Sequence, residues 1–226
     1  MNFFQLLKSH DDLLYEVVSW LAFYPITLWR ALRHPIATMD YAAAELQQQD
    51  EQRFDEALSP PILLLLTVLV AHGFELALIG DSELLARKTG LAGLINDDTS
   101  LILMRLVAFS TFPLVFAVHT VRKQRIQLTR SSLEPAFFAQ CYANAPFALL
   151  ISVAATLWQY QNDALKLCAA VMVVGGAIAF LAIQTTWFRK VLGVGFAAAV
   201  WNAVVSYLEA LVAMFALGWL VSGGGS

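Results

Sequence analysis

The sequence predicts an all-α integral membrane protein, a polytopic membrane helical bundle with five transmembrane helices preceded by amphipathic cytoplasmic helices. Of its 226 residues, 59% are hydrophobic and 14% are charged, and the mean hydropathy of +0.65 is too high for a soluble domain of this length. Five apolar runs are long enough to cross a hydrocarbon core of roughly 30 Å. We therefore divide the chain into cytoplasmic or interfacial helices at 1–58, a five-span domain at 59–221, and a segment at 222–226 that resembles a flexible linker rather than native sequence.

The N-terminal segment contains no run that is long enough to span a bilayer. Its apolar stretch at 13–24 is too short, carries Glu16 and is stopped by Pro25. After the proline, Trp29 and Arg33 lie near one side of a short amphipathic helix, and these residue types settle at a headgroup boundary. We interpret 13–34 as one or two interfacial helices, with a helix packed against the bundle as the alternative.

Residues 36–58 change in character, because they are rich in Ala, Gln and acids and lack Gly and Pro. This composition predicts a helix with a polar surface. Its acidic end, at 50–56, would be repelled by anionic lipid, so we expect it to dock on the basic loop 121–135. A merely solvated helix explains the same residues equally well.

The first predicted span, residues 59–80, begins at Pro60 and Pro61, which suit the first turn of a helix. His72 and Glu75 interrupt its apolar run and lie three residues apart, on one helical face. An ionisable residue inside a span costs roughly 2.5–3.5 kcal/mol on insertion scales, so Glu75 needs a partner or water. The pair could act as acid and base, but a structural ion pair explains it as well.

Four further spans are predicted after a polar loop, at 101–121, 136–158, 166–187 and 192–221. Most of the 14 Lys and Arg residues fall before the first span or in the turns that follow the second and fourth. The loop after the second span is basic and contains Arg122, Lys123, Arg125 and Arg130. The positive-inside rule therefore predicts a cytoplasmic N-terminus and an outside C-terminus, as in a bacterial inner-membrane protein.

Depth along the spans predicts an intramembrane polar cluster. Glu75 and Arg105 both fall in the outer half of the bilayer, and Glu209 falls just past the middle of the fifth span. We expect Arg105 to bridge Glu75, with Glu209 close by and His72 one turn away. Such a cluster is either the lock of the bundle or the floor of an outward-facing cavity.

The fifth span carries small and polar residues at three- and four-residue spacing, which gives a polar stripe through Asn202 and Ser206. Asn144 in the third span and Gln184 in the fourth are expected to be neighbours of this stripe. Close packing of small residues is the alternative explanation.

The sequence LWRALRHP before the membrane region and CYANAP in the third span, together with five spans, resemble the Yip1 family of small five-span membrane proteins. The resemblance implies the five-span fold, and bacterial-type members are often described as permeases. Eukaryotic members engage small GTPases through their N-terminal part. The DLYGP and GY motifs associated with those members are absent here, so the resemblance implies the fold rather than that partner.

No motif for hydrolysis, phosphate binding or zinc binding occurs, so we expect no catalytic residues, no cofactor and no metal. Cys141 and Cys168 are expected to be small buried hydrophobes. A net charge of −3 with mixed signs argues against nucleic acid as a partner. The function expected is a non-enzymatic membrane scaffold or adaptor that contacts lipids, a partner membrane protein or a second copy. The alternative is a small permease or channel component with a polar intramembrane path.

Overall fold

The computed structural model describes residues 3–47, 53–79 and 98–221, and these ranges fold into helices without a strand. The all-α prediction is confirmed. The helices are α1 (Phe3–Arg33), α2 (Pro35–Glu45), α3 (Pro60–Ile79), α5 (Asp98–Lys123), α6 (Arg130–Trp158), α7 (Asp163–Leu192) and α8 (Phe196–Val221). Most of the loop expected at 81–100 and the segment 222–226 lie outside the described residues.

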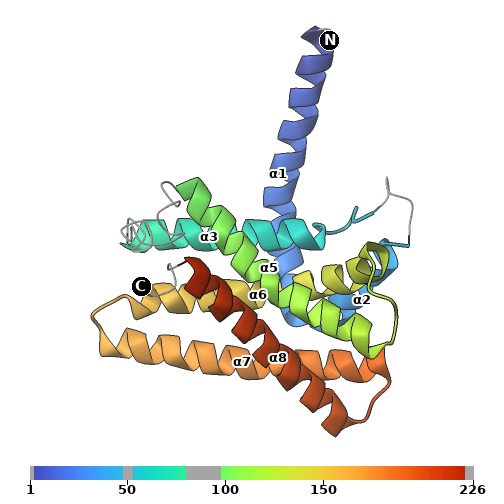
Figure 1. Ribbon diagram of the computed structural model, residues 1–226. Coiled ribbons are helices and arrows are strands. Elements are labelled where there is room, and N and C mark those ends of the chain that lie inside the picture. Colours follow the sequence, from blue (N-terminus) through green and yellow to red (C-terminus); the bar gives the residue numbers. More distant parts are fainter. Residues whose placement is uncertain (1–2, 48–52, 80–97, 222–226) are drawn as a thin grey trace.

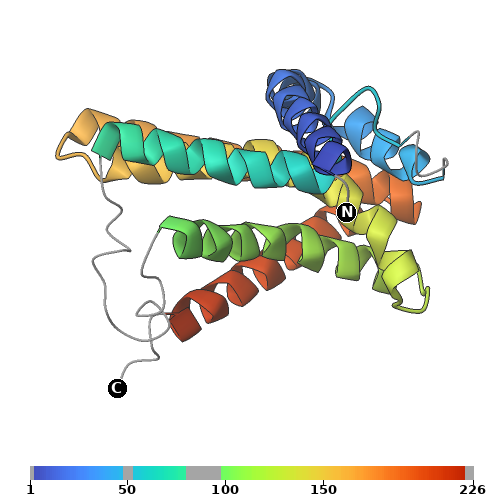
Figure 2. The ribbon, with the colours of Figure 1, turned by 90° about the horizontal axis from the view of Figure 1, so that it is seen from above.

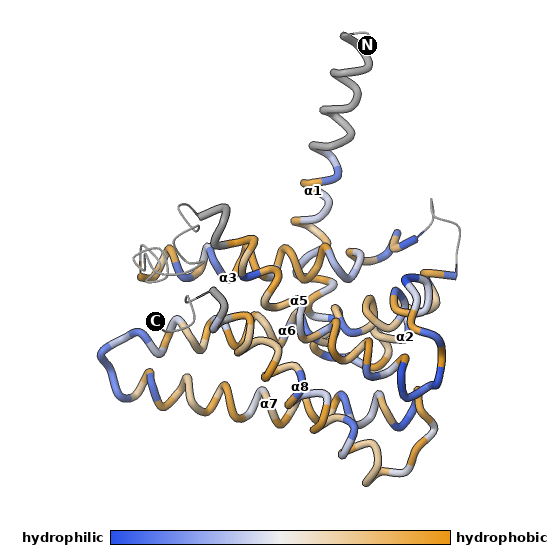
Figure 3. The backbone as a smooth tube through the Cα atoms, viewed as in Figure 1, coloured by the Kyte–Doolittle hydropathy of each residue, from blue (hydrophilic) through white to orange (hydrophobic). Residues whose placement is uncertain are grey.

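Five helices are long and apolar enough to cross a membrane, as predicted. These segments are Pro60–Ile79, Ile102–Lys123, Arg130–Trp158, Asp163–Leu192 and Phe196–Leu217. In Figure 1, α3, α6 and α7 run along one direction while α5 and α8 cross them obliquely. Figure 3 shows hydrophobic residues along these helices and hydrophilic residues at the turns that join them, as expected of an integral membrane protein.

Local capping explains why α6 and α7 begin before their apolar runs. The Thr129 side chain accepts from the Ser132 backbone N–H, and Ser132 reciprocates, so the basic loop leads directly into α6. At the next turn, the Asn162 side chain accepts from two backbone N–H groups and starts α7. Gly193, with φ of 62°, ends α7 in the left-handed conformation.

The core is organised around α6, which packs against α1, α2, α3, α5 and α7. Alanines at 139, 143, 145 and 148 are at most 4% exposed, and their small side chains let the neighbouring helices approach closely. Beside them lies an aromatic cluster, in which the rings of Phe147 and Phe180 stack at 4.7 Å. Phe112, Phe116 and Tyr207 close around Phe180, with ring centroids 5.4–6.4 Å from it.

The N-terminal segment forms one continuous helix, α1, in which Pro25 is not a stop. Of the one or two helices expected at 13–34, the structure therefore has one. Both halves of the helix are held by the bundle across that proline. The Tyr24 hydroxyl donates to Thr67 Oγ1 at 3.3 Å, and Thr27 Oγ1 accepts from the Leu58 N–H at 3.1 Å. Tertiary contacts on each side offset the lost backbone hydrogen bond. In Figure 1, α1 runs across the spanning helices rather than along them, and Figure 2 shows it nearly end-on beside α3.

The prediction of one polar helix at 36–58 is also wrong. Helix α2 ends at Glu45, and the chain turns back through Phe54, whose φ is 61°. Glu45 Oε2 accepts from the Phe54 N–H at 2.7 Å, which fixes the reversal. Burial, and then the Glu45 carboxylate, raise the pKa of Tyr41 to about 12. The composition of 36–45 correctly predicted a helix. It did not indicate that one side of this helix packs on α6.

The acidic stretch cannot dock as a helix, because the described part of it, residues 53–58, forms turns. Asp50 and Glu51 lie outside the described residues. The expected contact with the basic loop stays a prediction. An ion pair that the structure does show in this region joins Lys190 Nζ to Asp40 Oδ2 at 2.5 Å, between α7 and α2.

Candidate functional site

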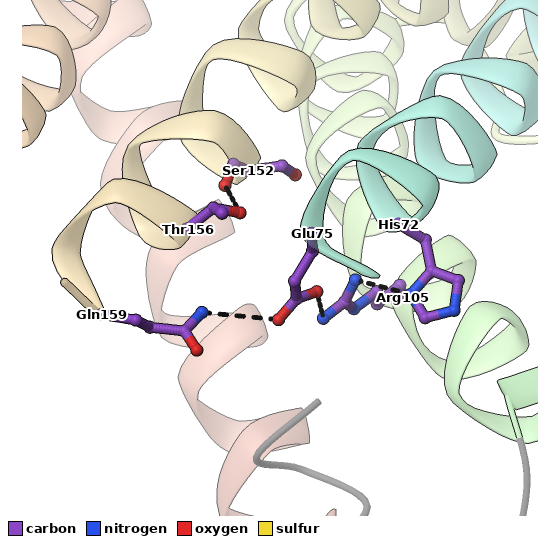
Figure 4. A network of polar contacts seen from close by, with 6 residues as sticks. All are labelled: His72, Glu75, Arg105, Ser152, Thr156 and Gln159. Atoms are coloured by element: carbon purple, nitrogen blue, oxygen red, sulfur yellow. Dashed lines mark hydrogen bonds and ion pairs between the residues drawn. The ribbon is translucent and has the colours of Figure 1, made fainter. Parts of the chain in front are cut away.

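Arg105 joins three helices near one end of α5. Its Nη2 pairs with the Glu75 carboxylate on α3, and its Nη1 lies 3.2 Å from His72 Nδ1. From the end of α6, Gln159 Nε2 donates to the other carboxylate oxygen of Glu75 at 3.4 Å. Figure 4 shows these side chains converging from the three helices. We call His72, Glu75, Arg105 and Gln159 the Arg105 group.

The Arg105 group is nearly closed to its surroundings. His72 is 4% exposed, Glu75 is 7% exposed, and the Arg105 side chain is 18% exposed. Because guanidinium can only donate, the Nδ1 atom of His72 is the acceptor in this contact. Nearby, the Thr156 hydroxyl donates to the Ser152 carbonyl of its own helix (Figure 4), so this hydrogen bond is not made to Glu75. The sequence-based expectation that Arg105 bridges Glu75 beside His72 matches this geometry.

A second polar group lies at the opposite end of α5. His119 Nε2 is 2.9 Å from Asn202 Oδ1, and its Nδ1 is 3.3 Å from Glu209 Oε2. Asn202 Nδ2 donates to the Ala198 carbonyl at 2.7 Å, which orients the amide so that its oxygen faces the ring. Both ring nitrogens therefore face oxygen atoms that can accept a hydrogen bond. We call His119, Asn202 and Glu209 the His119 group.

Glu209 was expected beside Arg105, and the structure contradicts that expectation. It contacts His119, which is separated from Arg105 by about 21 Å along α5. Helical side chains lean toward the N-terminus of their own helix, so Glu209 reaches back toward the start of α8. That start lies beside the end of α5, because the two helices run in opposite directions (Figure 1).

The polar stripe is brought together only in part. Asn202 joins the His119 group, and Ser206 is fully buried against the bundle. Asn144 instead donates to the Gln140 carbonyl in its own helix at 2.8 Å. Gln184 exchanges two hydrogen bonds with Gln140, at 3.0 and 2.7 Å, and so links α7 to α6. Sequence reasoning missed Gln140, although its four-residue spacing from Asn144 places both on one face of α6.

Packed aromatic rings separate the two polar groups. Phe112 and Phe116 lie on α5 between Arg105 and His119, and both rings contact Phe180 of α7. Phe116 is fully buried and Phe180 is 2% exposed. The middle of the bundle at this level is therefore apolar and filled.

All four cations of the basic loop, Arg122, Lys123, Arg125 and Arg130, are exposed. Arg125 has φ of 57° and takes the left-handed position that turns the chain between α5 and α6. These cations can bind anions at the end of the bundle. Cys141 is buried as expected, whereas Cys168 is exposed on α7 and that expectation is wrong.

Within the described part of the chain, no group of three or more His, Cys, Asp or Glu could hold a metal ion. Chemically, the Arg105 group can neutralise a buried carboxylate and tie helices together. The His119 group can offer a carboxylate to a donor, because the Glu209 side chain is 53% exposed. Searches of family models, curated proteins and solved structures match nothing to this chain.

Proposed function

We propose that this protein is a non-enzymatic membrane scaffold or adaptor, which contacts lipid or a partner protein through its N-terminal helices. The observation that carries the proposal is the placement of α1. The helix crosses the spans instead of following them (Figures 1 and 2). A helix that runs across the spans lies parallel to the plane of the bilayer, as an interfacial helix does.

Helix α1 has two apolar faces, and only one of them is used by the bundle. Thr27 and Ala31 are buried, with Trp20, Tyr24 and Leu28 packed beside them. A second stripe stays exposed and repeats at three- and four-residue spacing. Its large members are 55–64% exposed, at Val18, Leu21, Trp29 and Leu32. An exposed apolar stripe of this length needs a lipid or protein neighbour.

The neighbours of α1 indicate which side meets lipid. Leu32 lines a small apolar hollow with Phe147 of α6 and Gly176 of α7, both within the membrane spans. On the other side, Glu16 and Ser19 line a more polar hollow of about 530 Å³ together with Asp55. This distribution supports an interfacial helix with its exposed stripe toward hydrocarbon and its polar side toward water.

The alternative, a small permease or channel component, needs a polar path through the bundle. The aromatic cluster and the closed Arg105 group favour the scaffold. The half-exposed Glu209 is the observation that keeps the alternative as a second candidate. A Yip1-like identity, a bacterial inner-membrane location, and a cytoplasmic N-terminus with an outside C-terminus remain parts of the proposal that rest on the sequence.

The placement of α1 can be tested with fluorophores attached to single cysteines in vesicles. The fluorescence of a label at position 21 or 29, in place of Leu21 or Trp29, should be quenched by spin-labelled lipid. The fluorescence of a label in place of Glu16, on the same helix, should be quenched by aqueous iodide. Iodide quenching at all three positions would refute the interfacial placement. If the stripe recruits a partner, Leu21→Glu with Trp29→Glu should remove proteins that co-purify with the unaltered chain. A matched Leu103→Glu change, at an exposed residue of α5, should leave them.

A further inference from the structure

Helices α5 and α8 lie on the side of the bundle away from α1 (Figure 2). A lateral hollow lies between these two helices. At the basic end of α5 it has a volume of about 520 Å³ and is lined by His119, Arg122, Lys123 and Glu209, with Val115 and Val205 among its apolar walls. His119, Arg122 and Lys123 are three or four residues apart, so they share one side of α5.

The hollow continues along both helices as an apolar groove. Two further hollows, of about 450 and 760 Å³, share Ala213 and Ala216 with each other and share Glu209 or Val115 with the first. Along α5 the lining runs from His119 to Val107, about 18 Å at the helical rise per residue. One leaflet of hydrocarbon is about 15 Å thick. The groove is therefore long enough for one acyl chain across one leaflet.

From the end of α5 inward, the groove is lined first by cations, then by a carboxylate, and then by apolar side chains. Lys123 and Arg122 are at the end of α5, where a headgroup phosphate lies if this end is interfacial. Glu209 and His119 follow one helical turn deeper, about 5–6 Å away. Glu209 has one oxygen on His119, and its side chain is still 53% exposed to the groove. A half-exposed carboxylate at that depth needs a hydrogen-bond donor.

We propose that this groove binds a single-chain phospholipid that retains a free glycerol hydroxyl. The phosphate pairs with Arg122 and Lys123, the hydroxyl donates to the Glu209 carboxylate, and the acyl chain lies against Ala213 and Ala216. The glycerol of a two-chain phospholipid is esterified at both positions, so at the depth of Glu209, inward of the phosphate, it offers no donor. Charge complementarity supports the assignment, because Arg122 and Lys123 present two cations to one phosphate.

Native mass spectrometry of the full chain, titrated with 1-palmitoyl lysophosphatidylcholine, tests the proposal, because the choline headgroup has no N–H or O–H donor of its own. The two-chain phosphatidylcholine and the analogue without the free hydroxyl should each bind about tenfold more weakly, the cost of one hydrogen bond to a charged group. Glu209→Gln should reduce this preference for the hydroxyl, because a neutral amide oxygen accepts a weaker hydrogen bond than a carboxylate does. Arg122→Ala with Lys123→Ala should weaken the binding of all the phospholipids tested. The matched pair Arg125→Ala with Arg130→Ala, outside the lining, should leave binding unchanged.

A second variant keeps the test valid if Glu209→Gln disturbs folding. Ala213→Phe fills the apolar groove and touches none of the polar groups, and it should reduce lysophospholipid binding about tenfold. Equal binding of the three lipids, or binding that survives Ala213→Phe, would overturn the proposal. So would a dimer whose formation is lost in Ala213→Phe, because a second copy would then be the occupant of the groove.

Discussion

The Arg105 group and the His119 group each contain a histidine, a glutamate and a side-chain amide, yet their carboxylates differ in exposure. In the Arg105 group, Glu75 of α3 is 7% exposed and contacts Arg105 of α5 and Gln159 at the end of α6. In the His119 group, the Glu209 side chain is 53% exposed and meets one histidine from one neighbouring helix. The number of helices that converge on the carboxylate accounts for the difference.

This contrast assigns different roles to similar residues. A carboxylate enclosed by three helices stabilises their arrangement, because any movement of one helix leaves a charge without its partner. A carboxylate between two diverging helices keeps an open side and is available to a ligand. The aromatic cluster keeps the two groups apart, so the structure favours a lock and a separate lateral site over one continuous path.

The largest effect is expected from breaking the lock. Arg105→Leu strands the buried Glu75 and should lower the free energy of unfolding by about 3–5 kcal/mol. The double variant with Glu75→Leu should be more stable than the single variant, because no buried charge remains. Unfolding in mixed micelles by denaturing detergent measures both. Additive effects in the double variant would show that the two residues are not coupled.

A smaller effect is expected at the uncharged pair between α6 and α7. Gln184→Leu leaves the buried amide of Gln140 without its partner and should cost about 1–3 kcal/mol. Replacing both glutamines with leucine should recover most of that loss. The same unfolding assay applies, with Thr186→Leu, an exposed residue on the same helix, as the control. A double variant less stable than Gln184→Leu would contradict the pairing.

The smallest effect is expected at the exposed ion pair between Asp40 and Lys190, whose side chains are 39% and 53% exposed. Asp40→Asn should cost about 0.2–1 kcal/mol, and the difference should shrink as salt rises. Unfolding at low and high ionic strength measures it. A salt-independent loss would mean that Asp40 acts through packing of α2 instead.

Length and hydropathy were sufficient to predict the five spans, because a bilayer imposes a minimum apolar run on each. The Arg105 contact with Glu75 was also predictable, since one arginine and one acid at equal depth have few other partners. Glu209 was misplaced because depth along a straight helix ignores helix tilt and the lean of the side chain. Gln140 was missed because neutral amides barely disturb a hydropathy profile, and the burial of α2 because composition reports propensity rather than packing.

The difference in access between the two carboxylates can be measured directly with dicyclohexylcarbodiimide, an apolar reagent that adds to carboxyl groups from the lipid phase. In membranes, peptide mass spectrometry should find the adduct at Glu209 and not at Glu75, and Glu209→Gln should remove the labelling. The Arg105→Leu variant should make Glu75 reactive once its partner is lost. Labelling of Glu75 in the unaltered protein at a rate equal to that of Glu209 would contradict the closed lock and favour a path that reaches both groups.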